Sequence, residues 1–471
     1  MPKLPVTLIK GDKIGIETDY RDALPVNMYA VKKKILGASG YMIQYPGLEL
    51  LGTGAGIDRG ANYNERFSNQ YRVSGAKFVS VSTSGVVTEL GSIPGTSQAR
   101  LIDFYSFNTQ GVIADGKFFL YSPSGGFSEV TDTDLGAPID GVWVDGYYFM
   151  TDGDFIFHTD LTDESAIDPL KFATAEFMPD PSNGLSKTQD NKVMVWGRYS
   201  LEYFVNAATD NFAFSRVQTR AQKIGIVATH AKCESGGKFF ITGGYRDSAV
   251  GVYAVGIGSA GKVSTREIDK IIKQYTEPEL SDMRMEARTE DDTTFIIVHL
   301  PNEPLCFNES IAKSIGVEYA WSILKSDVQG NSPYRGINGV FDARSAKWVY
   351  GDKRDDSIGI LNNAICTHYD KLAEWILYTP LLNLSPFSVD EIELETIPGH
   401  TVDIDAKVAF SITYDGVMYG KEYWELYGQP NDYNQRFFLR RLGICNDWLG
   451  FKFRGASKSR MAFALMAVTY S

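Results

Sequence analysis

Cysteine and histidine are both scarce in this chain. Four cysteines occur among the 471 residues, and no two of them form a Cys-x-x-Cys pair: Cys233, Cys306, Cys366 and Cys445. This spacing disfavours a zinc ribbon or a thioredoxin-like redox site, and isolated thiols of this kind are predicted to be reduced and buried. The five histidines form no His-Glu-x-x-His or His-x-His motif, so structural roles are predicted for them: His158, His230, His299, His368 and His400.

Long apolar runs are also missing. The longest uninterrupted run, Met461–Val468, is far shorter than the roughly 18 residues that a membrane-spanning helix requires. The first residues, Met1–Gly15, contain no apolar core of the length found in a signal peptide. We therefore expect a soluble chain without a membrane span and without a secretion signal.

Basic residues are outnumbered. The chain has 46 lysines and arginines against 58 aspartates and glutamates, a formal net charge of −12. The densest basic run is Lys32–Lys34, which is most simply a solvated turn. Proteins that hold nucleic acid by neutralising phosphates show the opposite excess or a clear basic block. Tight binding of DNA or RNA is therefore disfavoured.

Motifs of common enzyme classes are absent or incomplete. There is no G-x-S-x-G elbow and no Walker A loop. Gly256–Gly261 matches G-x-G-x-x-G but lies between β-type patterns, so a glycine-rich turn is the preferred interpretation and a nucleotide site the alternative. The pairs Asp132/Asp134 and Asp152/Asp154 resemble fragments of calcium loops without completing the spacing. We assign no catalytic, cofactor-binding or metal-binding residue, expect no cofactor, and predict that the chain is not an enzyme.

Glycine and aromatic residues are abundant instead. The 45 glycines, 26 tyrosines and 27 phenylalanines are typical of many short strands joined by tight turns. Seven times, at intervals of 30 to 55 residues, a turn residue precedes a short strand of aromatic and β-branched residues: Gly75, Gly116, Gly146, Asn191, Gly237, Asp292 and Ala346. Such intervals favour the blades of a β-propeller, which bury their apolar faces by stacking around an axis. An irregular array of β-sandwiches is the alternative.

The patterns divide the chain into four parts. One helix is predicted at Ser264–Tyr275, with Ser264 as its N-cap and Glu267 at capping-box spacing. The blade pattern fades after residue 362, and simple period-2 strands typical of a sandwich begin at Phe387. We predict an all-β fold: an extended N-terminal segment that packs on or joins the propeller (1–57), a propeller-like domain of six to seven irregular blades (58–362), a connector (363–386) and a C-terminal antiparallel β-sandwich domain (387–471).

Short strings along the whole chain resemble the tail hub, or packaged-DNA stabilisation, proteins of short-tailed phages. They include Leu24–Met28, Thr159–Ser165, Ile268–Thr276, Ile297–Pro301, Tyr419–Glu422 and Gly450–Arg454. Each string is short, but their shared order from one end to the other makes the resemblance specific.

The resemblance implies a structural virion protein of a short tail, made in the host cytoplasm, with no catalytic residues to carry over. In that family, six copies form a hub below the portal and its adaptor ring. The implied partners of the homohexamer are the portal–adaptor ring, a trimeric tail needle or plug, and trimeric tailspikes. The implied function is to close the channel, stabilise the packaged DNA and dock needle and spikes for genome ejection. DNA would pass through the channel without tight binding.

Two other functions stay open at this point. A glycan-binding or glycan-cleaving propeller of a phage tail would suit the high tyrosine and tryptophan content. Such a protein would need a pair of carboxylates that converge at the axis, and sequence does not show convergence. A generic intracellular scaffold propeller is the other alternative.

Overall fold

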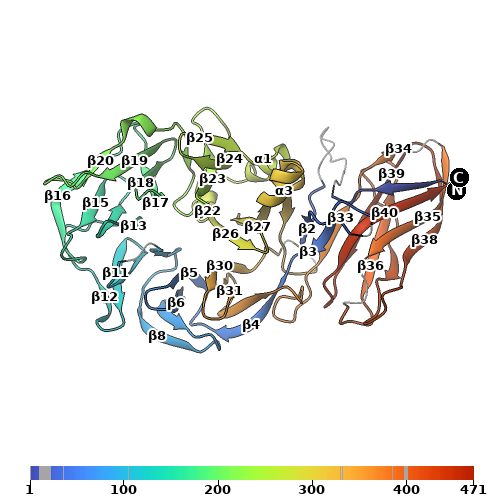
Figure 1. The fold of residues 1–471 in the computed structure, drawn as a ribbon, viewed down its shortest axis with the longest axis horizontal. Coiled ribbons are helices and arrows are strands. Elements are labelled where there is room, and N and C mark those ends of the chain that lie inside the picture. Colours follow the sequence, from blue (N-terminus) through green and yellow to red (C-terminus); the bar gives the residue numbers. More distant parts are fainter. Residues whose placement is uncertain are drawn as a thin grey trace.

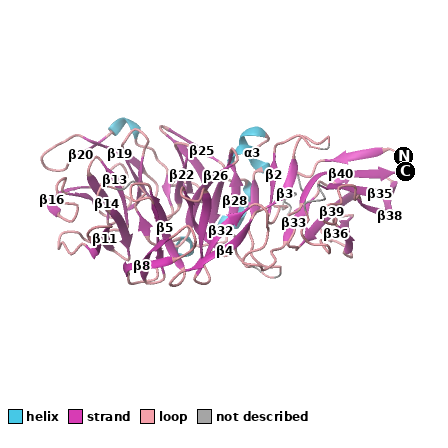
Figure 2. Cartoon of the chain, turned by 60° about the horizontal axis from the view of Figure 1, so that its bottom comes forward, coloured by secondary structure: helices cyan, strands magenta, loops and turns pink. Residues whose placement is uncertain are grey.

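The computed structural model describes residues 2–9, 23–35, 37–103, 106–328, 330, 332–383, 386–396 and 401–471. Nearly all regular structure is β-strand, and the strands form two bodies side by side: a ring of small sheets and a sandwich (Figure 1). Figure 2 shows that helices are confined to a few short pieces at the edges of the ring.

Seven sheets of the described residues surround one axis as blades. Blade 1 contains β5 (Asp58–Asn64), β6 (Asn69–Ser74), β7 (Lys77–Val81) and β8 (Val87–Ser92); blade 2 contains β9 (Arg100–Leu101), β10 (Gln110–Ala114), β11 (Lys117–Ser122) and β12 (Gly126–Glu129). Blade 3 contains β13 (Asp140–Val144), β14 (Tyr147–Thr151), β15 (Ile156–Thr159) and β16 (Ile167–Ala173); blade 4 contains β17 (Ser182–Lys187), β18 (Val193–Gly197), β19 (Leu201–Asn206) and β20 (Phe214–Arg216).

Of the other three blades, blade 5 has an additional strand and blade 7 takes one strand from the start of the chain. In blade 5, β21 (Gly225–Ile226) and β22 (Lys232–Ser235) both pair with β23 (Lys238–Gly244), which is followed by β24 (Gly251–Gly256) and β25 (Ser259–Lys262). Blade 6 contains β26 (Arg284–Glu290), β27 (Thr293–His299), β28 (Leu305–Asn308) and β29 (Trp321–Ile323). Blade 7 contains β30 (Gly336–Asp342), β31 (Lys347–Asp352), β32 (Ser357–Asn362) and, from the start of the chain, β4 (Gly47–Thr53).

The seven turn residues identified in the sequence each lie in a hairpin of a different blade: the second hairpin in blades 1 and 2, and the hairpin that follows the innermost strand in the other five. In blades 2 and 3 the turns are Asp115–Gly116, with φ of 48° and 72°, and Asp145–Gly146, with φ of 49° and 95°. Two successive positive φ values match the twist of the flanking strands in a two-residue hairpin, and aspartate followed by glycine adopts them readily. The prediction of a propeller with six to seven blades is confirmed, and the number of blades is seven.

Strand β4 closes the ring. It pairs antiparallel with β32, from Gly47 opposite Asn362 to Thr53 opposite Ser357. The last blade thus takes its outer strand from residues that precede the first blade, and the pairing removes the free edge of β32.

The remaining strands form the two sheets of a β-sandwich. One sheet has β1 (Lys3–Val6), β2 (Met28–Val31), β3 (Tyr41–Gln44), β40 (Ala462–Tyr470), β35 (Phe387–Thr396) and β38 (Phe437–Cys445). The other has β33 (Trp375–Tyr378), β34 (Leu382–Asn383), β39 (Trp448–Gly455), β36 (Lys407–Thr413) and β37 (Tyr423–Leu426).

The ends of the sandwich differ from the sequence-based boundaries. In the described part of the N-terminal segment predicted to pack on or join the propeller (1–57), β4 joins a blade, whereas β1–β3 belong to the sandwich. The segment assigned as a connector (363–386) contains β33 and β34 of the second sheet, with Ser385 outside the described residues. The physical reason is burial: Val6, Met28 and Trp375 lie in one apolar core with the C-terminal strands.

Helices are short and lie outside the blades. They are α1 (Arg266–Ile272), α2 (Glu277–Leu280), α3 (Glu309–Ser314) and the 3-10 turns η1 (Gln218–Arg220) and η2 (Val317–Tyr319). The predicted helix exists, but its N-cap is Thr265 rather than Ser264. The Ser264 hydroxyl instead donates to Asp269 at 2.6 Å and accepts from the Val252 amide at 3.0 Å, so it ties α1 to blade 5.

Asn27 joins the two domains. Its side-chain amide donates to the carbonyl of Lys325 at 2.8 Å, on the propeller side, and to the carbonyl of Glu374 at 2.7 Å, on the sandwich side. Its side-chain oxygen accepts from the Lys325 amide at 2.9 Å. Asn27 is buried and has φ of 51°, a value that asparagine tolerates better than most residues. A single side chain therefore satisfies backbone groups of both domains where they meet.

Candidate functional site

Charged side chains from the innermost strands of several blades converge at the propeller axis. Arg100 lies on β9, Asp140 on β13, Lys232 on β22 and Arg284 on β26. These strands lie at the inner edges of blades 2, 3, 5 and 6, toward the middle of the ring (Figure 1). Residues that are far apart in the sequence thereby form one polar cluster, which we call the axial cluster.

Asp140 is the centre of the axial cluster and has no solvent exposure. Its Oδ2 accepts from Lys232 Nζ at 2.7 Å and from the Leu185 amide at 2.8 Å, and Arg100 Nε lies 3.3 Å from its Oδ1. Burial alone would raise the pKa of Asp140, but Lys232, Arg100 and the Leu185 amide hold that pKa below its ordinary value. Asp140 is therefore a buried carboxylate that balances two cations.

Blade 4 leaves room for this contact because it has a glycine there. A Cβ added to Gly184 would lie 2.8 Å from Lys232 Nζ and 3.0 Å from Asp140 Oδ2. Any larger residue would push the lysine and the carboxylate apart.

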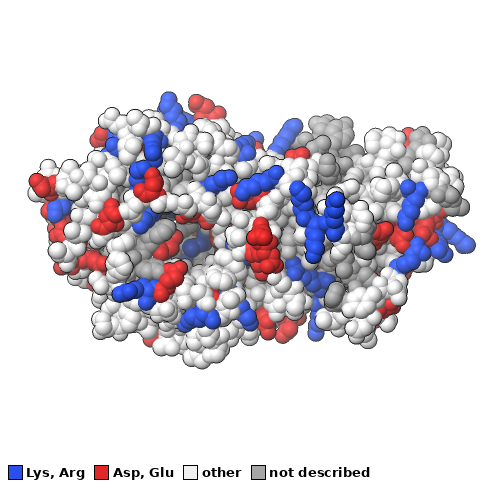
Figure 3. Space-filling model, in the orientation of Figure 1, with Lys and Arg blue, Asp and Glu red and all other residues white. Residues whose placement is uncertain are grey.

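A cavity of about 320 Å³ opens beside the axial cluster. Its charged lining residues are Arg100, Asp103, Lys187, Lys232, Glu234 and Arg284, together with His230. Figure 3 shows a hollow within the propeller, with acidic and basic side chains around it. Burial, followed by the charges of Arg284 and Lys232, lowers the pKa of His230 well below its ordinary value, so this imidazole is neutral at pH 7.

A second buried pair lies further along β26. Glu286 contacts His299 Nε2 through one carboxylate oxygen, and its other oxygen accepts from the Gly339 amide of blade 7 at 2.6 Å. Burial would raise the pKa of Glu286, but His299 and the Gly339 amide hold it at about 2. Burial also lowers the pKa of His299 to about 4, and the charge of Lys353 acts in the same direction. The pair links blade 6 to blade 7 and is enclosed by protein.

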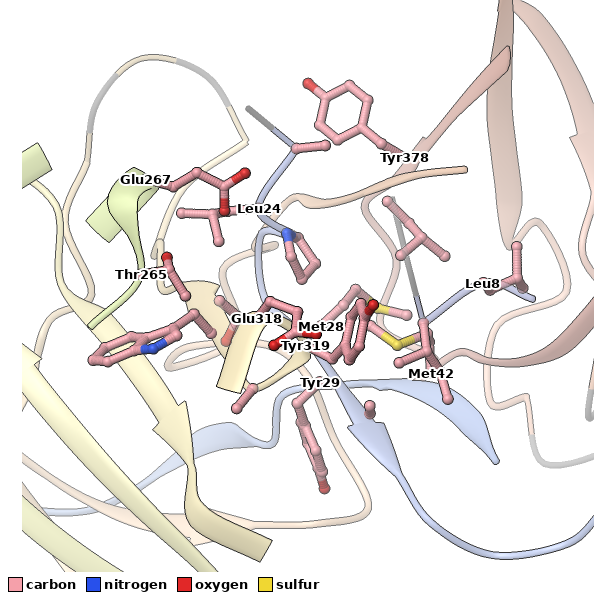
Figure 4. Close-up of a pocket in the computed structure, with 18 of the residues that line it drawn as sticks. Leu8, Leu24, Met28, Tyr29, Met42, Thr265, Glu267, Glu318, Tyr319 and Tyr378 are labelled. Atoms are coloured by element: carbon pink, nitrogen blue, oxygen red, sulfur yellow. The ribbon is translucent and has the colours of Figure 1, made fainter. Parts of the chain in front are cut away.

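A larger pocket, of about 490 Å³, lies where the propeller meets the sandwich. Figure 4 shows the apolar side chains of Met28 and Met42, from β2 and β3, on one side of it, and Leu24 beside Glu267. Glu267 and Glu318 line it from the propeller side, and Glu318 lies beside Tyr319. This interdomain pocket has the apolar lining and few polar groups of a binding cleft, but its residues also form the junction between the two domains.

The histidines of the described residues have structural contacts and do not come together. Nδ1 of His158 lies 2.8 Å from the Thr159 carbonyl, and its Nε2 accepts from the Ala213 amide at 3.2 Å. Nδ1 of His368 lies 2.8 Å from the Ser326 hydroxyl. His400 lies outside the described residues. Among the residues that the structure describes, no group of three His, Cys, Asp or Glu side chains is placed to hold a metal ion.

The other sequence motifs are turns. Gly256 pairs with Ser259, so the G-x-G-x-x-G motif forms the hairpin between β24 and β25, with φ of 75° at Gly258. Asp132 accepts from the backbone amide of Asp134 at 2.9 Å, and Asp152 accepts from that of Asp154 at 3.0 Å. These carboxylates cap their own turns.

The sequence patterns do not predict the axial cluster. One signal for part of it is the stretch Arg284–Glu290, in which Arg, Glu, Arg and Glu occupy every second position of β26. Charges at period 2 share one face of a strand, and a charged face on the innermost strand of a blade points to contacts between blades. For Arg100, Asp140 and Lys232, which are isolated charges in three different strands, no comparable signal exists.

Comparison with known proteins identifies the family of both domains. Residues 3–366 match the family model described as bacteriophage P22 Gp10, β-propeller, and residues 374–471 match the model described as bacteriophage P22 Gp10, β-sandwich. The chain is 30% identical to the tail hub protein gp10 of Salmonella phage P22, over 98% of both chains.

Among solved structures, the chain is similar to a catalytically inactive virginiamycin B lyase from Staphylococcus aureus, with 10% identity and a TM-score of 0.44 over 67% of this chain and 98% of that one. It is also similar to the N-terminal domain of Nup159, with 13% identity and a TM-score of 0.41 over 67% of this chain and 95% of that one. None of the described helices is long and apolar enough to cross a membrane. The two family models cover both domains, and the chain therefore belongs to the P22 Gp10 family and is a structural protein of a phage tail.

Proposed function

We propose that six copies of this chain form a tail hub that closes the portal–adaptor channel, stabilises the packaged DNA, and docks the tail needle and the tailspikes. The observation that carries the proposal is the 30% identity to a tail hub protein over 98% of both chains. Because this similarity extends through propeller and sandwich alike, the two domains are expected to work in the assembly as they do in the relative.

The charge of the chain supports a mechanical form of DNA retention. Each copy carries a formal charge of −12, and a hexamer would carry six times that charge. Strong binding through phosphate contacts requires clustered lysine and arginine, whereas an acidic ring repels a duplex that moves past it. The hub would thus hold DNA by closing the channel with its plug, and release it when the plug leaves.

The same proposal holds that the chain is not an enzyme. Catalysis by the histidines would require a nucleophile, a base and an orienting group within hydrogen-bond reach. His158 instead contacts backbone atoms, and His299 is enclosed with Glu286. Substitution of either residue by glutamine should change stability and leave no hydrolytic activity to lose on lipopolysaccharide-type glycans.

The experiment is a deletion of this protein from the virion, complemented by the wild-type chain. We expect deleted particles to package DNA and then lose it, which is measured as nuclease-sensitive DNA over time after packaging. We also expect the purified protein to bind duplex DNA only weakly near physiological salt. Deleted particles that keep their DNA, or a purified protein that binds duplex tightly with a steep salt dependence, would contradict the proposal.

A further inference from the structure

The cavity beside the axial cluster has more basic than acidic groups. The basic residues that line it are Arg100, Lys187, Lys232 and Arg284, and the acidic ones are Asp103 and Glu234. Asp140 does not line the cavity and is already engaged by Lys232 and Arg100. In a chain with a net charge of −12, this is a local reversal of sign.

Arg284 is the basic group without a carboxylate partner. Within the described part of the chain, no carboxylate oxygen lies within ion-pair distance of its guanidinium, and its hydrogen bond is a long one of 3.4 Å from Nη1 to Gln98 Oε1. A guanidinium has five N–H donors in a planar fork, so most of its donors have no acceptor among the described residues. Burial lowers the pKa of Arg284, which is the effect of removing a cation from water without a matching anion.

The carboxylate of Glu234 does not supply the missing charge. No hydrogen bond or ion pair joins it to any other residue that the structure describes, although it lines the same cavity. Burial, and then the charge of Asp103, raises the pKa of Glu234, and no cation of the cavity lowers it. The neutral form of His230, beside the same cations, is consistent with a positive potential in the cavity.

We propose that this cavity is a binding site for a compact oxyanion, a phosphate or a carboxylate, held chiefly by the Arg284 guanidinium with Lys187 and Lys232 around it. The volume of about 320 Å³ is in the range of small-molecule sites. Arginine is suited to this task because its fork donates two parallel hydrogen bonds to a phosphate or carboxylate. The oxyanion would join blades 4, 5 and 6 through Lys187, Lys232 and Arg284.

The test measures binding to the full-length protein by calorimetry and by thermal stability at constant ionic strength. Inorganic phosphate is the probe for a free oxyanion, an acetylated Asp-Glu-Asp peptide is the probe for a carboxylate from a protein, and sodium chloride is the reference. Arg284→Gln should weaken binding about 10- to 100-fold, since a hydrogen bond to a charged group contributes roughly 1.5–3 kcal/mol. Arg284→Lys, which keeps the charge but loses the fork, should retain part of the affinity.

Two further variants separate binding from folding. Arg246→Gln removes an exposed arginine of the same blade 5 region and should leave binding unchanged. Glu234→Gln removes a negative charge from the cavity and should tighten binding several-fold, which is the opposite sign from Arg284→Gln. This variant also tests the proposal if Arg284→Gln does not fold.

The outcomes are distinct. Binding of phosphate that competes with the peptide indicates a free oxyanion, and binding of the peptide alone indicates a carboxylate from a protein; both support the site if Arg284→Gln weakens them. Binding of neither probe would overturn the proposal. So would equal effects of Arg284→Gln and Arg246→Gln, or weaker binding in Glu234→Gln.

Discussion

Closure of the propeller by β4 leads to a quantitative prediction about Leu48. The Leu48 side chain is fully buried, with 0% exposure, in the core that blade 7 shares with Tyr45, Tyr350 and Leu361. Leu48→Ala removes three carbon atoms, or about 2.4 kcal/mol of transfer free energy at about 0.8 kcal/mol each. It also leaves a cavity, and comparable core substitutions cost about 2.7–5.0 kcal/mol. We expect a loss of about 3 kcal/mol in the free energy of opening the β4–β32 pair.

Hydrogen exchange with mass spectrometry is the suitable assay because it reports opening locally. The peptide that covers Ser357–Asn362 should exchange about 100-fold faster in Leu48→Ala, since each 1.4 kcal/mol corresponds to a factor of about ten. Leu50→Ala is the matched control on the same strand, because Leu50 is 56% exposed. Surface substitutions of this kind change stability by about 0.5 kcal/mol or less.

The two leucines therefore distinguish the explanations. If Leu48→Ala leaves exchange of β32 unchanged, β4 does not hold the ring closed. If Leu50→Ala accelerates exchange as much as Leu48→Ala does, the effect belongs to strand propensity rather than to burial.

Three more predictions follow from buried groups. The free energy of unfolding should fall as the pH drops from about 6.5 toward 4. Burial lowers the pKa of His299 to about 4 and that of His368 to about 3, so in this range the unfolded chain binds protons that the folded chain does not. Urea unfolding at pH 7.0, 5.5 and 4.5 should show a smaller decline of this free energy in His368→Gln than in the wild-type chain. Asn27→Ala should lower the free energy of unfolding by about 2–4 kcal/mol, since it leaves buried backbone groups of both domains unpaired. Asn211→Ala, at an exposed position, should change this free energy little in the same urea unfolding experiment. Asn27→Gly should lower the free energy of unfolding less than Asn27→Ala does, because glycine accepts the positive φ. Equal losses of stability in the two variants would show that backbone strain plays no part.

Much of the propeller could be predicted because its signals are local. A turn such as Asp145–Gly146 and the strand that follows it lie within a few residues, and the same short signal recurs once in every blade. Period-2 alternation in β36 likewise indicates a sandwich strand without reference to any partner. The fold class therefore depends on information that each short window of sequence contains.

The assignment of strands to sheets could not be predicted in the same way. Met28 and Met42 lie in short apolar strands, but such a strand does not say whether its partner belongs to a blade or to the sandwich. The axial cluster poses the same problem. Lys232 and Asp140 are 92 residues apart and each looks like an ordinary surface charge until the blades place them together. Convergence across distant segments is a property of the closed ring.

The pairing of β3 with β40 also has a consequence for synthesis on the ribosome. Met42 pairs with Phe463, which is made about 420 residues later. At about 5–20 residues per second, the first strands of the sandwich wait roughly 20–80 seconds for their partner. During that time Met28 and Met42 lack the cover of Phe463 and Met466, with which they share one apolar core. Slow translation or heat should therefore cause aggregation through these early strands, and a host chaperone that binds short apolar segments would have its best target there.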